Sequence, residues 1–330
     1  MEAQTHRGIL QLEYPVRRGI VHDWHGYEQL LDHVYESELR VPSKDYPILF
    51  TESVLAPVQQ REKVAELLFE KYGVPALYFA SPAVMSLMSS GRTTGLGVQV
   101  GAGVTTVVPV WEGFALGDGV RRWDLGGDDV TQRLRFLLCE MQGKHFSTTA
   151  DLEIVQDMKE KFAFVVDNIQ KKEHEWEMGR WDPPASGYLL PDGQEITLSH
   201  EQYHSGEIMF QPSLAGGHLK NVPGIHHMIW DSILACSVDT RRDLYSNIVC
   251  AGGATMLKGF PERLVEEVRV LAEGRGKSRV VITPERRYAA WIGGSIVASM
   301  SNFENVWLSR DVYEESGRCV GNLFYSGREP

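Results

Sequence analysis

Hydrophobic residues along the chain alternate between the spacing of amphipathic helices and short runs typical of strands. An i, i+3, i+4, i+7, i+8 repeat predicts a helix with an inward face made of Tyr27, Leu30, Leu31, Val34 and Tyr35. A second helix is predicted over 58–72, with Val64, Leu67 and Leu68 inward. Strands are predicted over 7–16, 48–50 and 76–80.

The same alternation continues toward the C-terminus. Residues 94–114 predict two strands joined by a tight Gly-X-Gly turn, and 150–167 predict a long helix. The stretch 169–187 is charged and contains Pro-Pro, so we expect an exposed loop there. Residues 246–264 predict a strand, a glycine-rich turn and a helix that has Pro261 in its first turn. A strand at 279–282 and an apolar helix at 291–303 complete an α/β pattern.

Length and charge narrow the class of protein. A chain of 330 residues is long enough for two lobes, each with its own core. The formal net charge of −11 disfavours general binding to nucleic acid or anionic membranes. The four cysteines form no CxxC pair, and no apolar run is long enough to span a membrane. We therefore expect a soluble intracellular protein in the cytoplasm or the nucleus.

Long blocks of the sequence resemble actin and occur in the same order. They include RGILQLEYPV-RRGIV, ELRVPSKDYPILFTES and PERRYAAWIGGSIVAS, and together they occupy residues 7–21, 38–53, 83–95, 103–116, 190–198, 241–260 and 284–299. So many blocks at matching spacing make the resemblance to the actin family specific. Two shorter blocks, SNIV and LKGF, resemble the actin-related subunit of dynactin.

The resemblance implies the two-lobed α/β fold that actin shares with sugar kinases and chaperone ATPases, with nucleotide held between the lobes. The matching positions imply a remnant of the first lobe over 1–85, a second lobe over 86–285 and a C-terminal return to the first lobe over 286–330. Residue 1 aligns inside the second subdomain of the family. We therefore expect the first phosphate loop, its lysine and most of the DNase-binding loop to be missing.

Missing strands would leave an exposed sheet edge in an incomplete first lobe. Two explanations stay open. One is a short protein whose edge is capped inside an assembly, and the other is a sequence that begins too late.

Several departures from the family fall where actins position magnesium and the attacking water. Gln99 and Ala102 stand in place of two aspartates, Pro82 in place of a glutamine, and Thr106 in place of a histidine. Proline has no side-chain donor or acceptor and cannot orient water. Because phosphoryl transfer depends on positioning and charge neutralisation, the resemblance implies slow hydrolysis or none.

Other positions match the family's nucleotide contacts. They lie in the second phosphate loop, at the start of the following helix beside Asp129, on a later helix, and in the C-terminal glycine-rich turn. The set is Gly101, Gly103, Gly127, Lys159, Glu160, Gly252, Gly253, Met256 and Arg287. Glycines allow backbone N–H groups to approach an anion closely, but they also simply close turns. ATP or ADP with Mg²⁺ is implied, with weakened binding.

A hydrophobic groove that receives helices and neighbouring subunits in actins is also matched. Its residues are Met88, Gly91, Thr93, Gly113, Phe114, Ile296, Val297, Met300 and Val306. A helix-in-groove contact with a complex partner or another actin-family subunit is one interpretation, and ordinary core packing is the other.

A histidine motif raises the alternative of a different class of function, a zinc hydrolase. His200, Glu201 and His204 spell H-E-x-x-H, which on a helix with a third ligand indicates a zinc hydrolase. Here the motif follows a strand-like ITLS and lies in a region that aligns with a segment of actin that binds no metal. The adjacent His226 and His227 are expected to be one packed and one solvated.

The sequence thus favours an actin-related structural or scaffolding subunit with a degenerate ATPase site. The first alternative is an ATP-binding, slowly hydrolysing actin-like protein, and the second is a zinc hydrolase.

Overall fold

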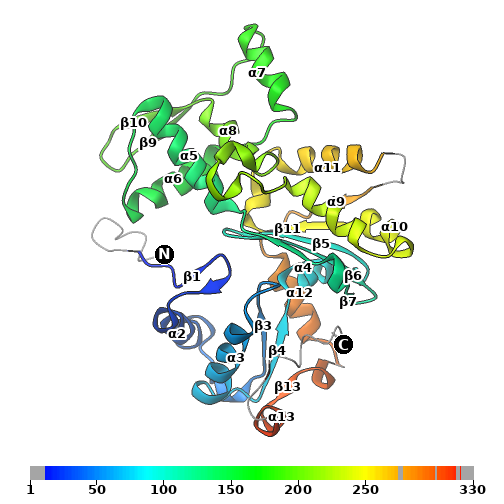
Figure 1. Cartoon of the computed structure of the whole chain (residues 1–330). Coiled ribbons are helices and arrows are strands. Elements are labelled where there is room, and N and C mark those ends of the chain that lie inside the picture. The colour runs from blue at the N-terminus through cyan, green and yellow to red at the C-terminus, as the bar shows by residue number, and fades with distance from the viewer. Residues whose placement is uncertain (1–11, 274–277, 302, 317–319, 321–330) are drawn as a thin grey trace.

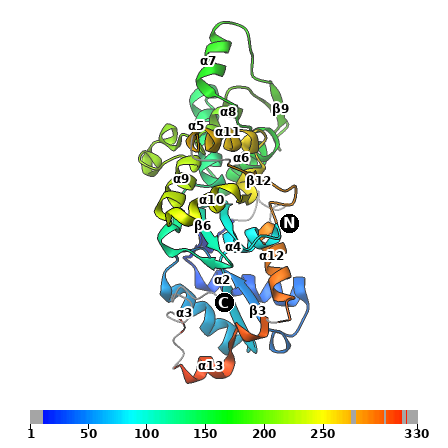
Figure 2. The same cartoon turned by 90° about the vertical axis from the view of Figure 1, so that its right-hand side faces the viewer.

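The computed structural model describes residues 12–273, 278–301, 303–316 and 320. A three-stranded sheet and a six-stranded sheet lie in the lower and middle parts of Figure 1, and a mainly helical part lies above them. Figure 2 shows the same arrangement from the side. The α/β class expected from the sequence is confirmed.

The lower part begins with a short hairpin, β1 (Val16–Arg17) and β2 (Ile20–Val21), and continues into helix α2 (Trp24–His33). Within the strand predicted over 7–16, residues 7–11 lie outside the described residues and 12–15 form no strand. In the predicted inward face, Leu31 of α2 is buried, but Leu30 is 49% exposed, and Val34, which begins the π-helical turn Val34–Leu39 after α2, is 38% exposed. The helical prediction is therefore correct, and its buried face is narrower than the repeat suggested.

The three-stranded sheet has the order β13-β4-β3. The strands are β3 (Ile48–Thr51), β4 (Ala76–Ala80) and β13 (Leu308–Ser309), and the flanking helices are α3 (Val58–Glu66), α4 (Pro82–Ser89) and α13 (Arg310–Glu315). Helix α3 continues as a π-helical turn to Lys71. Among the described strands β3 pairs only with β4, and its residues are half-buried or exposed. Strand β3 is therefore one edge of this sheet among the described strands, and the expectation of an edge left open by missing strands stays a prediction.

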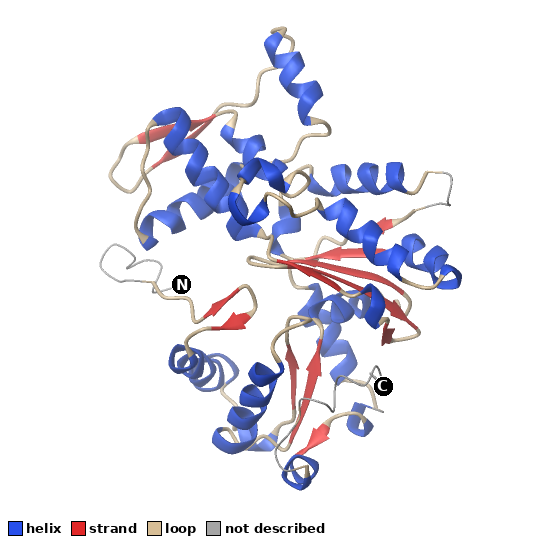
Figure 3. Ribbon diagram, viewed as in Figure 1, coloured by secondary structure: helices blue, strands red, loops and turns tan. Residues whose placement is uncertain are grey.

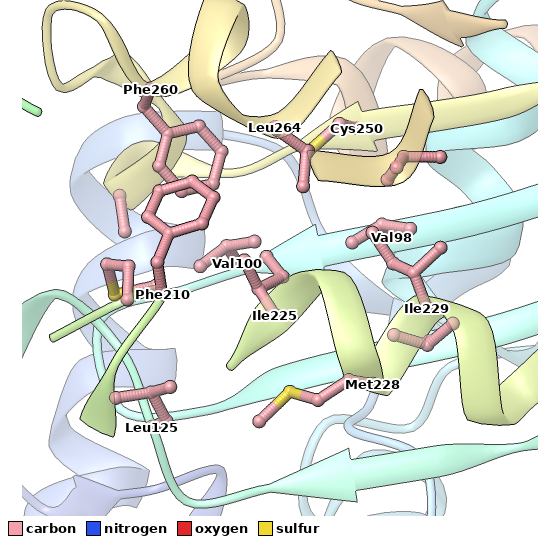
Figure 4. Packing of buried hydrophobic residues seen from close by; sticks show 14 of the residues in the cluster. Val98, Val100, Leu125, Phe210, Ile225, Met228, Ile229, Cys250, Phe260 and Leu264 are labelled. Carbon is pink, nitrogen blue, oxygen red and sulfur yellow. The ribbon is translucent and has the colours of Figure 1, made fainter. Parts of the chain in front are cut away.

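The six-stranded sheet has the order β12-β11-β5-β6-β7, with β8 also paired to β6. Its strands are β5 (Gly95–Val100), β6 (Thr105–Trp111), β7 (Phe114–Ala115), β8 (Arg121–Trp123), β11 (Ile248–Ala251) and β12 (Val280–Val281). Strands β5 and β6 form the predicted antiparallel pair around Gly101–Gly103. Their apolar side chains, including Val98 and Val100, pack against Ile225 and Ile229 of α9 (Ile225–Ala235) in Figure 4.

The upper part in Figures 1 and 3 holds most of the remaining helices and a separate hairpin. It contains α5 (Gly127–Gln142), α6 (Thr149–Phe162), α7 (Ile169–Glu177), β9 (Ser186–Leu189), β10 (Glu195–Leu198) and α8 (Glu201–Glu207). Beside the six-stranded sheet lie α9, α10 (Val238–Ser246) and α11 (Phe260–Leu271), and α12 (Ala289–Ala298) packs on α4. In the described residues no helix is long and apolar enough to cross a membrane.

Helix α7 corrects the expectation of a loop over 169–187. The Asn168 side chain accepts a hydrogen bond from the Lys171 amide at 2.9 Å and so caps the helix N-terminus. Lys172 pairs with Glu175 at 2.8 Å on the helix surface. Because this helix is largely polar, capping and charge pairs indicate it better than a hydrophobic repeat does.

Candidate functional site

A cavity of about 480 Å³ lies between the glycine loop after β5, the start of α5, one face of α6 and the turn after β11. These four segments and Arg287, which precedes α12, supply its walls. The lining residues are Ala102, Gly127, Asp128, Val130, Gln156, Lys159, Glu160, Lys161, Ala163, Gly253, Ala254, Met256, Leu257, Lys258 and Arg287. Only the tertiary fold brings these segments to one place.

Six residues of the expected nucleotide set line this cavity: Gly127, Lys159, Glu160, Gly253, Met256 and Arg287. Gly101, Gly103 and Gly252 are not among the lining residues. The carbonyl of Gly101 accepts a hydrogen bond from the Gly127 amide at 3.0 Å, so it helps to hold the start of α5, which lines the cavity. A Cβ on Gly103 would lie 3.0 Å from the Arg18 backbone, so that glycine allows a close approach of two chain segments.

Two adjacent glycines after β11 differ sharply in their surroundings. Gly252 has φ +105°, and a Cβ there would lie 2.2 Å from the Val100 carbonyl oxygen. Gly253 is exposed in the cavity wall, and a Cβ there would meet nothing within 4 Å. The first glycine is therefore required by the turn, whereas the second leaves space for a ligand.

We expect Gly252→Ala to lower the free energy of unfolding by more than about 1 kcal/mol, because both the left-handed backbone and the nearby carbonyl oppose a side chain. Gly253→Ala should stay within about 0.5 kcal/mol of the parent. Urea denaturation of the two variants checks this pair. Equal losses would show that the turn does not depend on the Gly252 conformation.

The lining of the cavity favours an anionic ligand. Four cationic side chains and two carboxylates face it, from Lys159, Lys161, Lys258, Arg287, Asp128 and Glu160. Burial lowers the pKa of Lys159, and burial raises the pKa of Asp128. An anion beside Lys159 would stabilise its charged form and offset the cost of burial.

The face of α6 that lines the cavity was only partly anticipated. Gln156, Lys159 and Glu160 follow the i, i+3, i+4 spacing on one face of α6, and Ala163 continues this spacing directly after the helix ends at Phe162. Lys258 and Leu257 were also missed, although they directly follow the glycine-rich turn. Periodicity around the matched Lys159 is the signal that would have found Gln156 and Ala163.

Gln99, Pro82 and Thr106 stand where the family has catalytic groups, and they lie close together around Ser86. The hydroxyl oxygen of Ser86 lies 3.0 Å from the Gln99 side-chain oxygen and 2.8 Å from the Pro82 carbonyl oxygen, so its single proton is shared between these two acceptors. Pro82 begins helix α4, and Thr106 is buried opposite Gln99 across the strand pair. None of these four side chains carries a negative charge with which to hold a hydrated cation.

The cationic lining of the cavity fits an anionic ligand better than the uncharged Ser86–Gln99 region fits a hydrated cation. Gly253 keeps the wall open, and Lys159 and Arg287 supply donors. In the described part of the chain, no group of three His, Cys, Asp or Glu side chains is placed to hold a metal ion.

The matched groove residues lie around the ends of α4 and α12 and the β6–β7 turn. The amide of Gly113 donates to the Thr93 carbonyl at 2.8 Å, which joins two of the segments. Met88, Val297 and Val306 pack together against one core cluster. Phe114, Ile296 and Met300 are 40%, 42% and 48% exposed, and Gly91 is also exposed. The set is therefore partly core and partly an accessible apolar surface.

The H-E-x-x-H motif follows strand β10, as the strand-like ITLS suggested, and its Glu201 and His204 lie on helix α8. His200 precedes α8, and its ring lies 6.4 Å from that of His204. The Glu201 carboxylate is buried and accepts hydrogen bonds from the Gln142 side chain and the Ser199 amide. A carboxylate held in this way is not available as a general base for water.

The adjacent histidines behave as expected. His226 is buried, and His227 is exposed. Burial lowers the pKa of His226 to about 4.

The fold and the cavity define an α/β protein in which distant segments enclose a largely cationic cavity. The family model "Actin" matches residues 1–321. The chain is similar to an "Actin-like protein" of Neurospora crassa, with 42% identity over 319 residues, which cover 96% of this chain and 83% of that protein. The chain therefore belongs to the actin family.

Proposed function

We propose that this actin-related protein is a structural or scaffolding subunit of a cytoskeletal or other multi-protein assembly, and that its nucleotide site is degenerate. The observation that carries the proposal is the contact between Ser86 and Gln99, beside Pro82. It occupies the region where the family positions water and magnesium. A nucleotide bound in the cavity would therefore stay largely unhydrolysed and act as a structural ligand.

An apolar surface supports the scaffolding part of the proposal. Phe114, Ile296 and Met300 expose hydrophobic area, and Met88 and Val297 anchor it to the core. Exposed apolar side chains on a packed base suit the docking of an amphipathic helix or of another actin-family subunit. We also propose that this protein is cytoplasmic, with the nucleus as the alternative compartment. Its similarity to the actin-related subunit of dynactin stays a prediction.

The alternative is an ATP-binding actin-like protein with slow hydrolysis. The cationic lining around Lys159 and Arg287 favours it, because such a lining attracts phosphate groups. If ATP or ADP binds, Lys159, Glu160 and Met256 would hold its sugar and base, and Gly127 and Gly253 would leave room for it. The bound nucleotide would supply phosphate charge to the cationic lining of the cavity.

We expect ATP to bind the purified chain, with and without Mg²⁺, and to give no multiple-turnover phosphate release. Lys159→Ala should weaken binding about tenfold or more, because a buried charged donor contributes about 1.5–3 kcal/mol. Isothermal titration and a phosphate-release assay measure the two properties.

Lys161→Ala is the matched control for this experiment. Lys161 also lines the cavity, but it is exposed and pairs with Asp157 at 2.6 Å, so its loss should change affinity less than twofold. Multiple turnover would contradict the degenerate site. Absence of binding at millimolar ATP would leave a scaffold whose cavity residues serve the fold alone.

A further inference from the structure

The two histidines of the H-E-x-x-H motif lie beside helix α7, and each contacts a side chain of that helix. The rings of His200 and Trp176 meet in a T-shaped arrangement, with 4.4 Å between their centroids. The Nε2 atom of His204 lies 3.4 Å from the Glu173 carboxylate. His200 also shares a hydrogen bond with the Tyr203 hydroxyl at 2.9 Å, so the two imidazoles face different partners. The motif therefore forms a contact surface for α7.

Helix α7 is anchored at its start and held by side chains further along. It projects from the upper part of the molecule in Figures 1 and 3. Its first residue, Ile169, is buried, whereas Trp176 is 45% exposed. Gly179 follows the helix with φ +64°, and a Cβ there would meet nothing within 4 Å. The ion pair of Lys172 with Glu175 lies within α7 and does not attach it to α8. The outer turns of α7 therefore depend on the contacts with the two histidines.

Aromatic rings from α7 and the segment after it cover this side of α8. Trp176 lies against His200, and Trp181 lies 5.5 Å from Tyr203 in a T-shaped arrangement. The Tyr203 ring in turn lies 4.5 Å from the ring of His204. These rings reduce the access of water to the His204 imidazole, so movement of α7 away from α8 would return that imidazole to water.

The surroundings of His204 disfavour a positive charge on its ring. Burial lowers the pKa of His204, and the nearby His200 and Arg133 of α5 lower it further. The carboxylates of Glu173 and Glu201 raise it, but burial is the largest effect. The pKa of His204 therefore lies below the ordinary value of 6.5 while α7 is docked. Protonation consequently favours the arrangement in which the ring is exposed to water.

We propose that His204 makes the docking of α7 on α8 dependent on pH, so that protonation of its imidazole releases the outer turns of the helix about Gly179. Docking is fully retained above pH 6.5, where the imidazole is neutral both in the docked state and in water. It weakens as the pH falls from 6.5 through the lower pKa of the docked state. The release does not depend on a ligand in the cavity.

Hydrogen exchange of the α7 amides, measured by mass spectrometry at pH 7.5 and pH 5.5 and corrected for the intrinsic pH dependence of exchange, tests the proposal. In the parent, protection should fall by about threefold or more at the lower pH. His204→Gln is neutral at both pH values, and its protection should change by less than about 1.5-fold. His174→Gln is the matched control, because His174 is 66% exposed on α7 itself and its loss should leave the full fall in place.

Glu173→Gln supplies a second readout if His204→Gln fails to fold. It removes a carboxylate that opposes the effect of burial on His204, so the fall in protection should be larger than in the parent. Tighter protection of α7 at pH 5.5 in the parent, or a smaller fall in Glu173→Gln, would show that the ion pair with Glu173 dominates and would overturn the proposal.

Two further outcomes would also overturn it. An equal fall in the parent and in His204→Gln would mean that another group titrates. A helix α7 that is unprotected at both pH values would mean that it is not docked on α8 in solution.

Discussion

Replacing Arg263 with methionine should lower the free energy of unfolding by about 3–5 kcal/mol at pH 8. Arg263 is buried on α11 and donates to Glu267 at 2.7 Å, to the Val166 carbonyl at 2.9 Å and to Glu207 at 3.4 Å. Its guanidinium also lies over the Phe210 ring. Methionine would fill much of the volume but would leave the fully buried Glu207 carboxylate without its cation.

The pH dependence identifies Glu207 as the source of this loss. Burial raises the pKa of Glu207 to about 7, and Arg263 opposes that shift. The folded pKa therefore exceeds the ordinary value of 4.5, so this group's contribution to stability is fully present below pH 4.5 and is lost as the pH rises to about 7. Because Glu207 accepts a proton at low pH, the Arg263→Met loss should shrink markedly at pH 5.5.

Urea denaturation at pH 5.5 and pH 8 measures this difference. The buried His226 lowers the free energy of unfolding of both proteins as the pH falls below 6.5. This effect largely cancels when the variant is compared with the parent at the same pH. Arg269→Met is the control, because Arg269 pairs with Glu266 on the surface of the same helix and should contribute less than about 0.5 kcal/mol. The same loss at both pH values would show that Glu207 is not responsible.

Replacing Gly293 with alanine should separate α12 from α4. A Cβ at this position would lie 1.7 Å from the Met85 carbonyl oxygen, which belongs to the backbone of the facing helix. Backbone cannot rotate aside as a side chain does, so the helices must move apart and lose packing. We expect a loss of about 3 kcal/mol or more in the free energy of unfolding, at the upper end of overpacking effects.

The neighbouring Gly294→Ala is the matched control and should have the opposite sign. Its Cβ would meet only the end of the Leu49 side chain, at 3.3 Å. Alanine in a helix interior is favoured over glycine by up to about 1 kcal/mol, so this variant should be neutral or more stable. Chemical denaturation of both variants compares them directly. Equal effects would mean that α12 does not pack on α4 as closely as the structure shows.

The sequence alone identified the fold class, the family and most of the elements near the cavity. Gly-X-Gly between two strands predicted the β5–β6 turn correctly, and the strand, turn and helix around Gly253 were also correct. These features are local, because they depend on backbone freedom and on periodicity over a few residues. Helix α7 was missed because its largely polar surface follows no hydrophobic repeat.

Tertiary structure decided which of the matched residues share a site. The sequence does not distinguish the roles of Gly252 and Gly253. In the structure Gly252 closes a turn against Val100, whereas Gly253 faces the cavity. Arg18 carries no motif, yet it contacts Asp129, 111 residues further along the chain. Local pattern thus determines which elements form. Contacts between distant segments depend on how the elements pack, and only the folded structure specifies those distances.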